Sequence, residues 1–190
     1  MGESLTLDVE SFEKRLGLTP GFNFKLLEED DWSFLIKISA LVEAACTHTL
    51  AHKFGYPELE DSLARLDQGA SKIGRISLLK KTGALYDNQA KTLTALANLR
   101  NLAAHDIKNV DFKLKEHIAN HNKQQRTKFI TEFGGSIDTT TTWFGKEYEK
   151  SDFVYRYPKL CIWAAVCEIL ACLYLEVEQP KLELPLLNFK

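Results

Sequence analysis

The sequence predicts an all-α protein, a compact helical bundle of about five to seven helices. Two long segments, residues 31–54 and 158–177, are apolar over most of their length, and residues 84–110 carry apolar side chains at three- and four-residue spacing. That spacing is the period of an α-helix. With 190 residues, of which 45% are hydrophobic and 26% charged, the chain is long enough to form one core without disulfides or metals.

Residues 1–29 are predicted to be an acidic appendage to a single domain formed by residues 30–190. Residues 1–31 carry eight acidic side chains against three basic ones. A short helix is expected over residues 8–16, because a glycine and a proline follow it. The formal charge of -2 for the whole chain argues against a strongly electrostatic DNA or membrane binder.

The helix expected over residues 31–54 is apolar around almost its whole circumference, as a central buried helix requires. Asp30 or Asp31 caps its start. Glu43 is the exception on the buried side, where a lone carboxylate is expensive. We therefore predict that Glu43 pairs with Arg100.

The segment from residue 57 to 81 is expected to form two short helices around a turn. Its residues 69–74 have the glycine spacing of a phosphate loop, but Arg75 and Ile76 follow where Lys and Ser or Thr are needed. An ordinary helix pair of a bundle is the favoured interpretation. The alternative is a helix-turn-helix in which four basic side chains face DNA phosphates: Lys72, Arg75, Lys80 and Lys81.

Residues 87–105 are expected to form the next helix, with Asp87 or Asn88 as its cap. One face is apolar and the opposite face is polar. The polar face carries Lys91, Thr94, Asn98, Asn101 and His105. Arg100 is expected on the apolar, buried face, where a guanidinium needs a carboxylate, a phosphate or a wet interface.

Residues 106–130 are basic, with six basic side chains against three acidic ones. A break is expected near residues 106–109, followed by a helix from residue 111 to about residue 133. The candidate phosphate-binding residues are Lys108, Lys113 and Lys115, which follow the end of the preceding helix. A solvated helix face is the alternative interpretation.

Residues 134–151 are expected to form a long loop with Trp143 and Phe144 as its anchors. Nucleic-acid bases could stack on these rings, or the rings could dock onto the core or a partner chain. The final helix, residues 158–177, is interrupted by Glu168, and each side is shorter than a bilayer span. A buried helix that also meets a second subunit, rather than a membrane span, is therefore expected, with an extended tail after it.

No metal and no cofactor are expected. Two histidine pairs at one-turn spacing, His48 with His52 and His117 with His121, lack a third ligand, so both pairs are expected on solvated faces. The four cysteines form no CxxC pair, which indicates buried free thiols in a reducing cytoplasm.

The string Arg100-Asn101-Leu102-Ala103-Ala104-His105 resembles the signature of the HEPN superfamily (higher eukaryotes and prokaryotes nucleotide-binding), in which an arginine, a polar residue and three further residues precede a histidine. The layout of residues 30–106 and 158–177 is also similar to the mannitol operon repressor family and related HEPN-like domains. The shared features are a glutamate inside an apolar helix, a glycine-lysine segment and the helix that ends in the string. The resemblance covers roughly half of the chain.

The resemblance implies an RNA-binding or metal-independent RNA-cleaving domain, of a toxin or defence kind, that acts as a homodimer. It implies that His105 is the general base or acid on a ribose 2'-hydroxyl, that Arg100 holds the scissile phosphate and that Asn101 orients one of them. RNA and a protein partner, an antitoxin or a regulator, are the expected partners. The alternative is a non-catalytic dimeric regulator resembling the mannitol operon repressor, in which Arg100 and Glu43 are structural.

The spacing of Arg100 and His105 sets a condition on the catalytic interpretation. On an ideal helix the two side chains lie about 140° apart. They converge on one substrate only if the helix ends at His105 or a second chain contributes one of them.

Overall fold

The computed structural model describes residues 2–105 and 107–178, with the backbone alone at residues 2, 3, 107 and 108. In this part of the chain, ten α-helices, three 3-10 segments and one β-hairpin follow one another. The all-α prediction is confirmed. The expected five to seven helices are too few, because several expected helices and loops contain separate short helices.

Long helices and short helical turns are interspersed along the chain. The α-helices are α1 (Gly2–Arg15), α2 (Phe22–Lys25), α3 (Asp31–Phe54), α4 (Glu60–Leu63), α5 (Arg75–Lys81), α6 (Asp87–Ala104), α7 (Leu114–Ala119), α8 (Lys123–Phe133), α9 (Lys150–Arg156) and α10 (Pro158–Glu178). The 3-10 segments are η1 (Leu26–Glu28), η2 (Pro57–Leu59) and η3 (Ile107–Asp111). The strands are β1 (Thr140–Trp143) and β2 (Lys146–Glu149). The expected extended tail after α10 lies outside the described residues.

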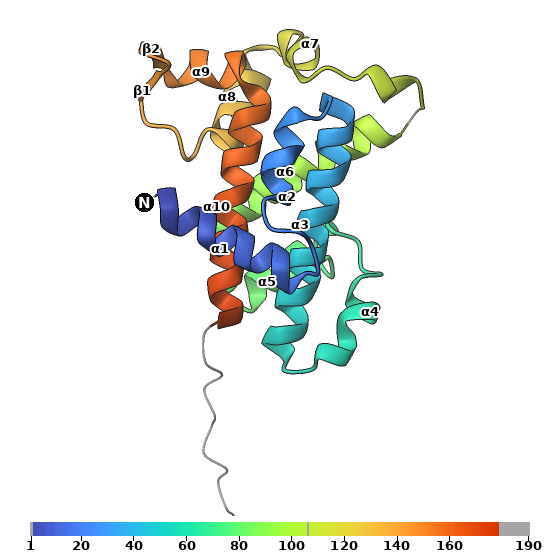
Figure 1. The fold of residues 1–190 in the computed structure, drawn as a ribbon. Helices are drawn as coiled ribbons and strands as arrows, with labels where there is room; N and C mark the ends of the chain where they lie inside the picture. The colour runs from blue at the N-terminus through green and yellow to red at the C-terminus, as the bar shows by residue number, and fades with distance from the viewer. Residues whose placement is uncertain (1, 106, 179–190) are drawn as a thin grey trace, which may run out of the picture.

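Helices α3, α6 and α10 form the centre of the bundle (Figure 1). α3 packs against both α6 and α10, and α6 also contacts α10. Their fully buried side chains include Phe34, Ile38 and Leu50 of α3 and Leu93 and Leu96 of α6. Burial of large apolar side chains from all three helices is what holds the bundle together.

The starts of the two helices that carry the candidate site are set by local hydrogen bonds. Asp30 caps α3, and its Oδ1 accepts from the Ser33 N–H at 2.9 Å, as predicted. α6 begins at Asp87, but its N-cap is Tyr86, whose N–H donates to Gln89 Oε1 at 2.9 Å. The expected cap at residue 87 or 88 is therefore wrong, because the glutamine side chain satisfies the N-terminal turn instead.

Helices α3 and α10 are also long and apolar enough to cross a bilayer. In the bundle, 67% of the most apolar window of α3 and 56% of that of α10 are buried. Core helices of a bundle meet the same criteria of length and composition, so these two helices do not by themselves indicate a membrane protein.

α1 belongs to the core, which corrects the expected acidic appendage. The helix begins at Gly2, earlier than expected, and packs against α10. Val9 and Phe12 are 2% and 1% exposed and belong to the hydrophobic core. Glu13 is buried too, and its carboxylate accepts hydrogen bonds from the backbone N–H groups of residues 21–23. Although the N-terminal segment is acidic in composition, α1 has an apolar stripe that packs on the bundle.

The segment between α6 and α10 is more broken than predicted. The single helix expected over residues 111–133 is divided into α7 and α8, because Asn122 starts a new helix. The Asn122 side chain accepts from the Gln125 N–H at 2.9 Å, and the Gln125 side chain accepts from the Asn122 N–H at 2.9 Å, which is a capping box. The loop expected over residues 134–151 contains the antiparallel hairpin β1–β2. The consecutive threonines of β1 are β-branched and favour a strand.

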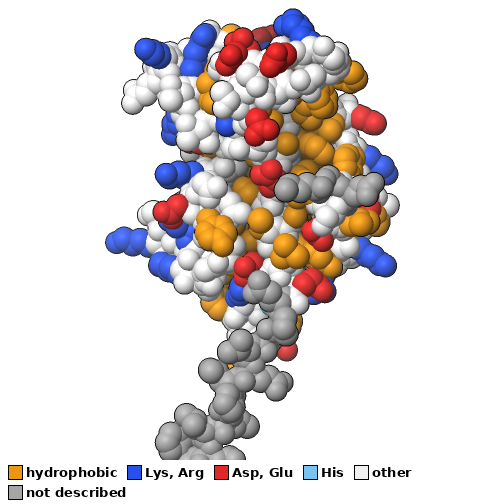
Figure 2. Space-filling model, turned by 90° about the vertical axis from the view of Figure 1, so that its left-hand side faces the viewer, with side chains coloured by type: hydrophobic (Ala, Val, Ile, Leu, Met, Phe, Trp, Pro, Cys, Tyr) orange, Lys and Arg blue, Asp and Glu red, His pale blue; other side chains and the backbone are white. Residues whose placement is uncertain are grey.

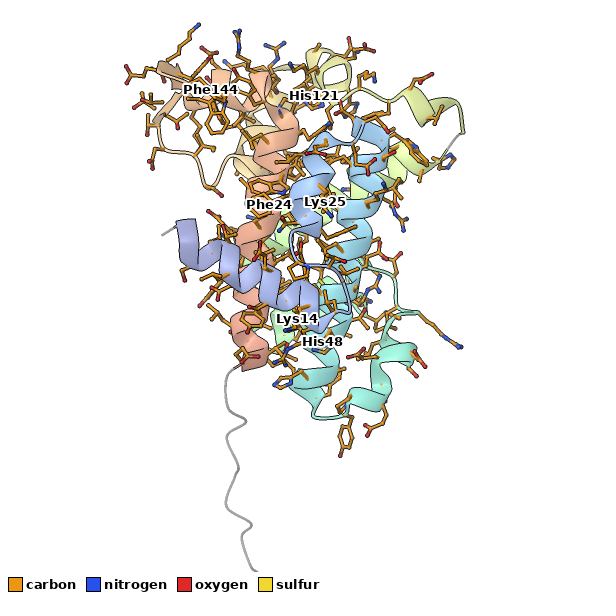
Figure 3. All side chains as sticks on the ribbon, in the orientation of Figure 1. Lys14, Phe24, Lys25, His48, His121 and Phe144 are labelled. Carbon is orange, nitrogen blue, oxygen red and sulfur yellow. The ribbon has the colours of Figure 1, made fainter. Side chains whose placement is uncertain are left out.

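The hairpin turns at Phe144 and Gly145, whose φ angles are 48° and 72°. A two-residue turn with positive φ at both positions matches the twist of a hairpin, but such a φ is unfavourable for a bulky residue. Phe144, labelled in Figure 3, is 94% exposed, so it does not anchor this segment. Trp143 does so instead, through an edge contact with Phe153 at 6.0 Å between ring centroids.

One face of the molecule carries a band of hydrophobic side chains bordered by charged ones (Figure 2). Leu7 of α1 and Phe24 of α2 are exposed apolar side chains, with exposed fractions of 63% and 39%. Phe24 also contacts Trp163 of α10, with ring centroids 5.1 Å apart. The surface of the described residues therefore includes apolar regions.

Candidate functional site

Glu43 of α3 lies between two arginines. Its Oε2 is 2.9 Å from Arg75 Nη2, and its Oε1 is 3.2 Å from Arg100 Nη2. The predicted pair of Glu43 with Arg100 is therefore present, and Arg75 is a second partner that sequence reasoning missed. One carboxylate thus joins α3, α5 and α6.

Arg75 is the most buried member of this cluster, with 4% of its surface exposed. Its Nη1 also donates to Thr47 Oγ1 at 3.1 Å and to the Ala64 carbonyl at 3.3 Å. A buried guanidinium needs such neutralisation and hydrogen bonding, because an unpaired charge in the interior is costly. Since Arg75 points inward, it does not face DNA phosphates, whereas Lys80 is exposed and paired with Asp87 at 2.7 Å. The helix-turn-helix alternative therefore loses Arg75 as a phosphate contact.

Gly74 forms a tight turn directly before Arg75, and this turn places the Arg75 side chain in the interior. A Cβ added at Gly74 would lie 2.5 Å from the Ala70 carbonyl oxygen and 2.6 Å from the Ala70 nitrogen. Only glycine permits this close approach of two backbone segments. The glycine spacing noted in the sequence therefore serves a tight turn before α5 and not a phosphate loop.

Arg100 is more exposed than predicted. Its side chain is 40% exposed, and the neighbouring Ala104, expected on the buried face, is exposed as well. Arg100 Nη1 donates to Asn101 Oδ1 at 3.0 Å. The guanidinium therefore lies at the boundary between the core and solvent, where some of its N–H groups are accessible to solvent.

These residues line a pocket of about 550 Å³. We call it the Glu43 pocket, and its polar lining includes Glu43, Gln68, Arg75, Asn98, Arg100 and Asn101. Among the described residues, two buried atoms of this lining have no hydrogen-bond partner: Arg75 Nε, a donor, and Gln68 Oε1, an acceptor. Buried polar groups are normally satisfied, so these two atoms are exceptions in the lining of the pocket.

The three side chains in contact at the centre of the Glu43 pocket carry a net positive charge, because Arg75 and Arg100 oppose the single carboxylate of Glu43. The lining as a whole is formally neutral, because it also includes Asp67. An arginine fork matches the oxygens of a phosphate or carboxylate. The centre of the pocket is therefore suited to an anion, with amides of Asn98 and Asn101 available beside it.

His105 is not part of the Glu43 pocket. It is exposed and forms the C-cap of α6, one residue beyond the helix, and it does not belong to the pocket lining. Within one chain, the structure brings Asn101 and Arg100 together but does not bring His105 to them. α6 does end at His105, which was one of the two conditions for convergence, yet His105 does not line the Glu43 pocket of its own chain.

Two of the predicted phosphate-binding lysines, Lys113 and Lys115, do not lie beside Arg100. The side chain of Lys108 lies outside the described residues. Lys113 and Lys115 line a different pocket, of about 640 Å³, which shares no lining residue with the Glu43 pocket. Proximity in sequence misled the prediction, because η3 carries the chain away from the end of α6 before α7 begins.

The histidine pairs are not on freely solvated faces, which corrects that expectation. His48 is half-buried, and its Nδ1 is 2.6 Å from Glu60 Oε1. His117 and His121 have ring centroids 5.0 Å apart, and His121 also contacts the ring of Phe129. Burial lowers the pKa of both His117 and His121.

The described residues contain no group of three or more His, Cys, Asp or Glu side chains arranged to hold a metal ion. The four cysteines are free, and Cys172 is the one that is not fully buried. Burial raises the pKa of Cys46 to about 11 and that of Cys161 to about 12, so these thiols are poor nucleophiles.

Comparison with known proteins gives no relative. No protein-family model, no curated protein and no solved structure matches the chain. The geometry of the Glu43 pocket and the position of His105 are therefore the basis for inferring a function.

Proposed function

We propose that this chain is an RNA-binding domain whose Glu43 pocket binds a backbone phosphate, and that two copies of the chain together cleave RNA without a metal. The observation that carries the proposal is the shared carboxylate: Arg75 and Arg100 both contact Glu43, so this cluster of three carries one positive charge in excess, although Asp67 makes the whole lining formally neutral. Arg100 is the partner that reaches solvent, so it is the residue that would contact the phosphate.

The lining of the Glu43 pocket supports an RNA ligand over a simple inorganic anion. Its volume of about 550 Å³ is in the range of pockets that bind nucleotide-sized molecules, roughly 300–1,000 Å³. Asn98 and Asn101 supply amides at the mouth, and Gln68 supplies a buried acceptor without a partner. These groups can hydrogen-bond ribose hydroxyls or a base edge next to the phosphate.

His105 is the proposed general base or acid for a ribose 2'-hydroxyl, since imidazole exchanges protons near neutral pH. It is exposed at the end of α6 and would act on RNA held by the Glu43 pocket of the partner copy. Leu102 and Val110, on either side of it in sequence, are 43% and 47% exposed. An apolar edge of this kind suits a contact between two copies of the chain.

The resemblance of residues 100–105 to the HEPN signature points to the same chemistry. It supports a role of a toxin or defence kind, in the cytoplasm, with a protein such as an antitoxin as a further partner. In this proposal Arg100 stabilises the charge that develops on the phosphate, and Asn101 orients Arg100 through the hydrogen bond already present.

The test is cleavage of total RNA by the purified chain in the presence of EDTA. We expect the wild type to release fragments with 2',3'-cyclic phosphate ends, and we expect His105→Ala and Arg100→Ala to be inactive although folded. Arg65→Ala is the matched control, because Arg65 is exposed and does not line the Glu43 pocket. Intact RNA with the wild type, or equal cleavage by His105→Ala, would refute the catalytic proposal.

A second candidate function is a non-catalytic dimeric regulator resembling the mannitol operon repressor. The separation of His105 from the Glu43 pocket within one chain favours it, because the arginine cluster then serves to join three helices. In that case, RNA stays intact with every variant, and Arg100→Ala changes neither RNA binding nor the oligomeric state.

A further inference from the structure

A second pocket, of about 640 Å³, lies where three distant parts of the chain meet. The start of α7, the junction between α9 and α10 and the segment before α3 contribute to it. We call it the α7–α10 pocket, and its lining includes Leu27, Lys113, Lys115, Arg156, Tyr157 and Leu160. It shares no lining residue with the Glu43 pocket, so its role does not depend on the proposed function.

Internal contacts already occupy two of the charged groups of this pocket. Lys159 Nζ is 2.9 Å from Asp31 Oδ1 and donates to the Glu29 carbonyl at 2.6 Å. The second oxygen of Asp31 accepts from the Leu114 N–H at 2.9 Å. Asp31 and Lys159 therefore tie α7 and α10 to the start of α3, and they are not available to a ligand.

The remaining charges of the α7–α10 pocket are mostly positive. Lys113, Lys115 and Arg156 are exposed at the pocket, against the single remaining carboxylate of Glu116. The hydrogen bond with Tyr148, together with the nearby charges of Arg156 and Lys115, lowers the pKa of the Tyr157 phenol. The lysines and Arg156 thus give this pocket a local excess of positive charge in a chain that is acidic overall.

The other wall of the pocket is apolar. Leu27, Leu160 and the Tyr157 ring are half-buried there, and Pro158 is buried. Small-molecule sites combine a mostly apolar wall with a few convergent polar groups, in volumes of roughly 300–1,000 Å³. The α7–α10 pocket has both properties.

We propose that the α7–α10 pocket binds a small amphiphilic organic anion. The apolar part of the ligand, an acyl chain or an aromatic ring, packs against Leu27, Tyr157 and Leu160. Its carboxylate or phosphate is bound by Lys113, Lys115 and Arg156. The two lysines that the sequence marked as phosphate-binding candidates thus bind an anion at a site separate from Arg100.

Titration calorimetry of the full chain with three probes tests this proposal: decanoate, adenosine monophosphate and uncharged decanol. We expect decanoate or adenosine monophosphate to bind, and the one that binds distinguishes an acyl from an aromatic ligand. We expect decanol to bind at least tenfold more weakly than decanoate. If decanoate is the ligand, its affinity rises by about fourfold for each buried methylene along a series of carboxylates.

Paired variants place the binding in the α7–α10 pocket. The double variant Lys113→Ala/Lys115→Ala is expected to weaken anion binding at least tenfold. The control Lys72→Ala/Lys123→Ala removes the same charge at exposed lysines outside this pocket and is expected to bind like the wild type. Equal affinity of the two double variants, equal binding of decanol and decanoate, or no binding of either anion would overturn the proposal.

Discussion

The two arginines that share Glu43 should contribute very differently to stability. The side chain of Arg75 is 5% exposed and makes three hydrogen bonds, whereas that of Arg100 is 40% exposed. Replacing either arginine with methionine keeps a long side chain and removes the charge. The comparison therefore measures the charge and its hydrogen bonds more than the loss of packing.

The expected magnitudes follow from burial. Removing one partner of a buried pair costs about 3–5 kcal/mol. For Arg75→Met we expect about 3 kcal/mol, at the lower end of that range, because Arg100 still neutralises Glu43. For Arg100→Met we expect about 0.2–1 kcal/mol, as for other solvent-screened pairs. In a domain of this size, the cost expected for Arg75→Met corresponds to a fall in Tm of roughly 6–12 °C. The cost expected for Arg100→Met corresponds to a fall of at most about 4 °C.

Thermal and urea unfolding followed by circular dichroism at 222 nm measure both costs, with Arg65→Met as the exposed control. If Arg100→Met destabilises the chain as much as Arg75→Met, the assignment of Arg75 as the structural partner is wrong. Arg100 would then be needed for the fold. Loss of RNA binding by an Arg100 variant would in that case not show that Arg100 contacts the RNA.

Three further predictions concern the turn before α5, the hairpin and the buried histidines. Gly74→Ala should destabilise the chain by about 1–3 kcal/mol, because its Cβ would lie 2.5 Å from the Ala70 carbonyl oxygen; an unchanged urea midpoint would contradict the close approach. Phe144→Asn should raise stability by roughly 1 kcal/mol, because asparagine tolerates positive φ and the phenylalanine is exposed; a lower Tm would show that the edge contact of the Phe144 ring with Trp143, at 5.2 Å between ring centroids, outweighs the relief of backbone strain. Burial lowers the pKa of His117 and His121 below 6.5, so the unfolded chain binds more protons, and stability present above pH 6.5 should be lost as the pH falls below it. His117→Gln/His121→Gln should weaken this acid sensitivity in unfolding experiments between pH 5 and 7, and an identical pH profile would contradict it.

The long helices could be predicted from the sequence because their signals are local. The apolar run of α3 and the polar cap at Asp30 define that helix without knowledge of the rest of the fold. The burial of α1 could not be predicted with the same certainty, because it depends on the distant surface of α10. The hairpin was also missed, since Phe144 occupies a turn position at which asparagine or glycine would have signalled a two-residue turn.

Half of the arginine cluster could be inferred from the sequence. Glu43 and Arg100 are each the lone charge on an apolar helix face, and a buried charge needs a partner of opposite sign. The pairing can therefore be predicted, and Glu43 does pair with Arg100. The sequence pattern around Arg75 suggests only a phosphate loop or a DNA-binding helix, and it does not indicate a buried partner for Glu43. A signal was present in the glycine just before Arg75, but its meaning depends on the tertiary approach to Ala70.

Complementation between two inactive variants tests most directly whether two chains form one RNA-cleaving site. Arg100→Ala and His105→Ala are each expected to be inactive in EDTA. When the two are mixed and allowed to exchange subunits, half of the dimers are heterodimers, and each heterodimer holds one intact Arg100 opposite one intact His105. We therefore expect about a quarter of the wild-type activity to return, as follows from a two-fold symmetric dimer. No recovery, in a mixture shown by mass spectrometry to contain heterodimers, would contradict the shared site.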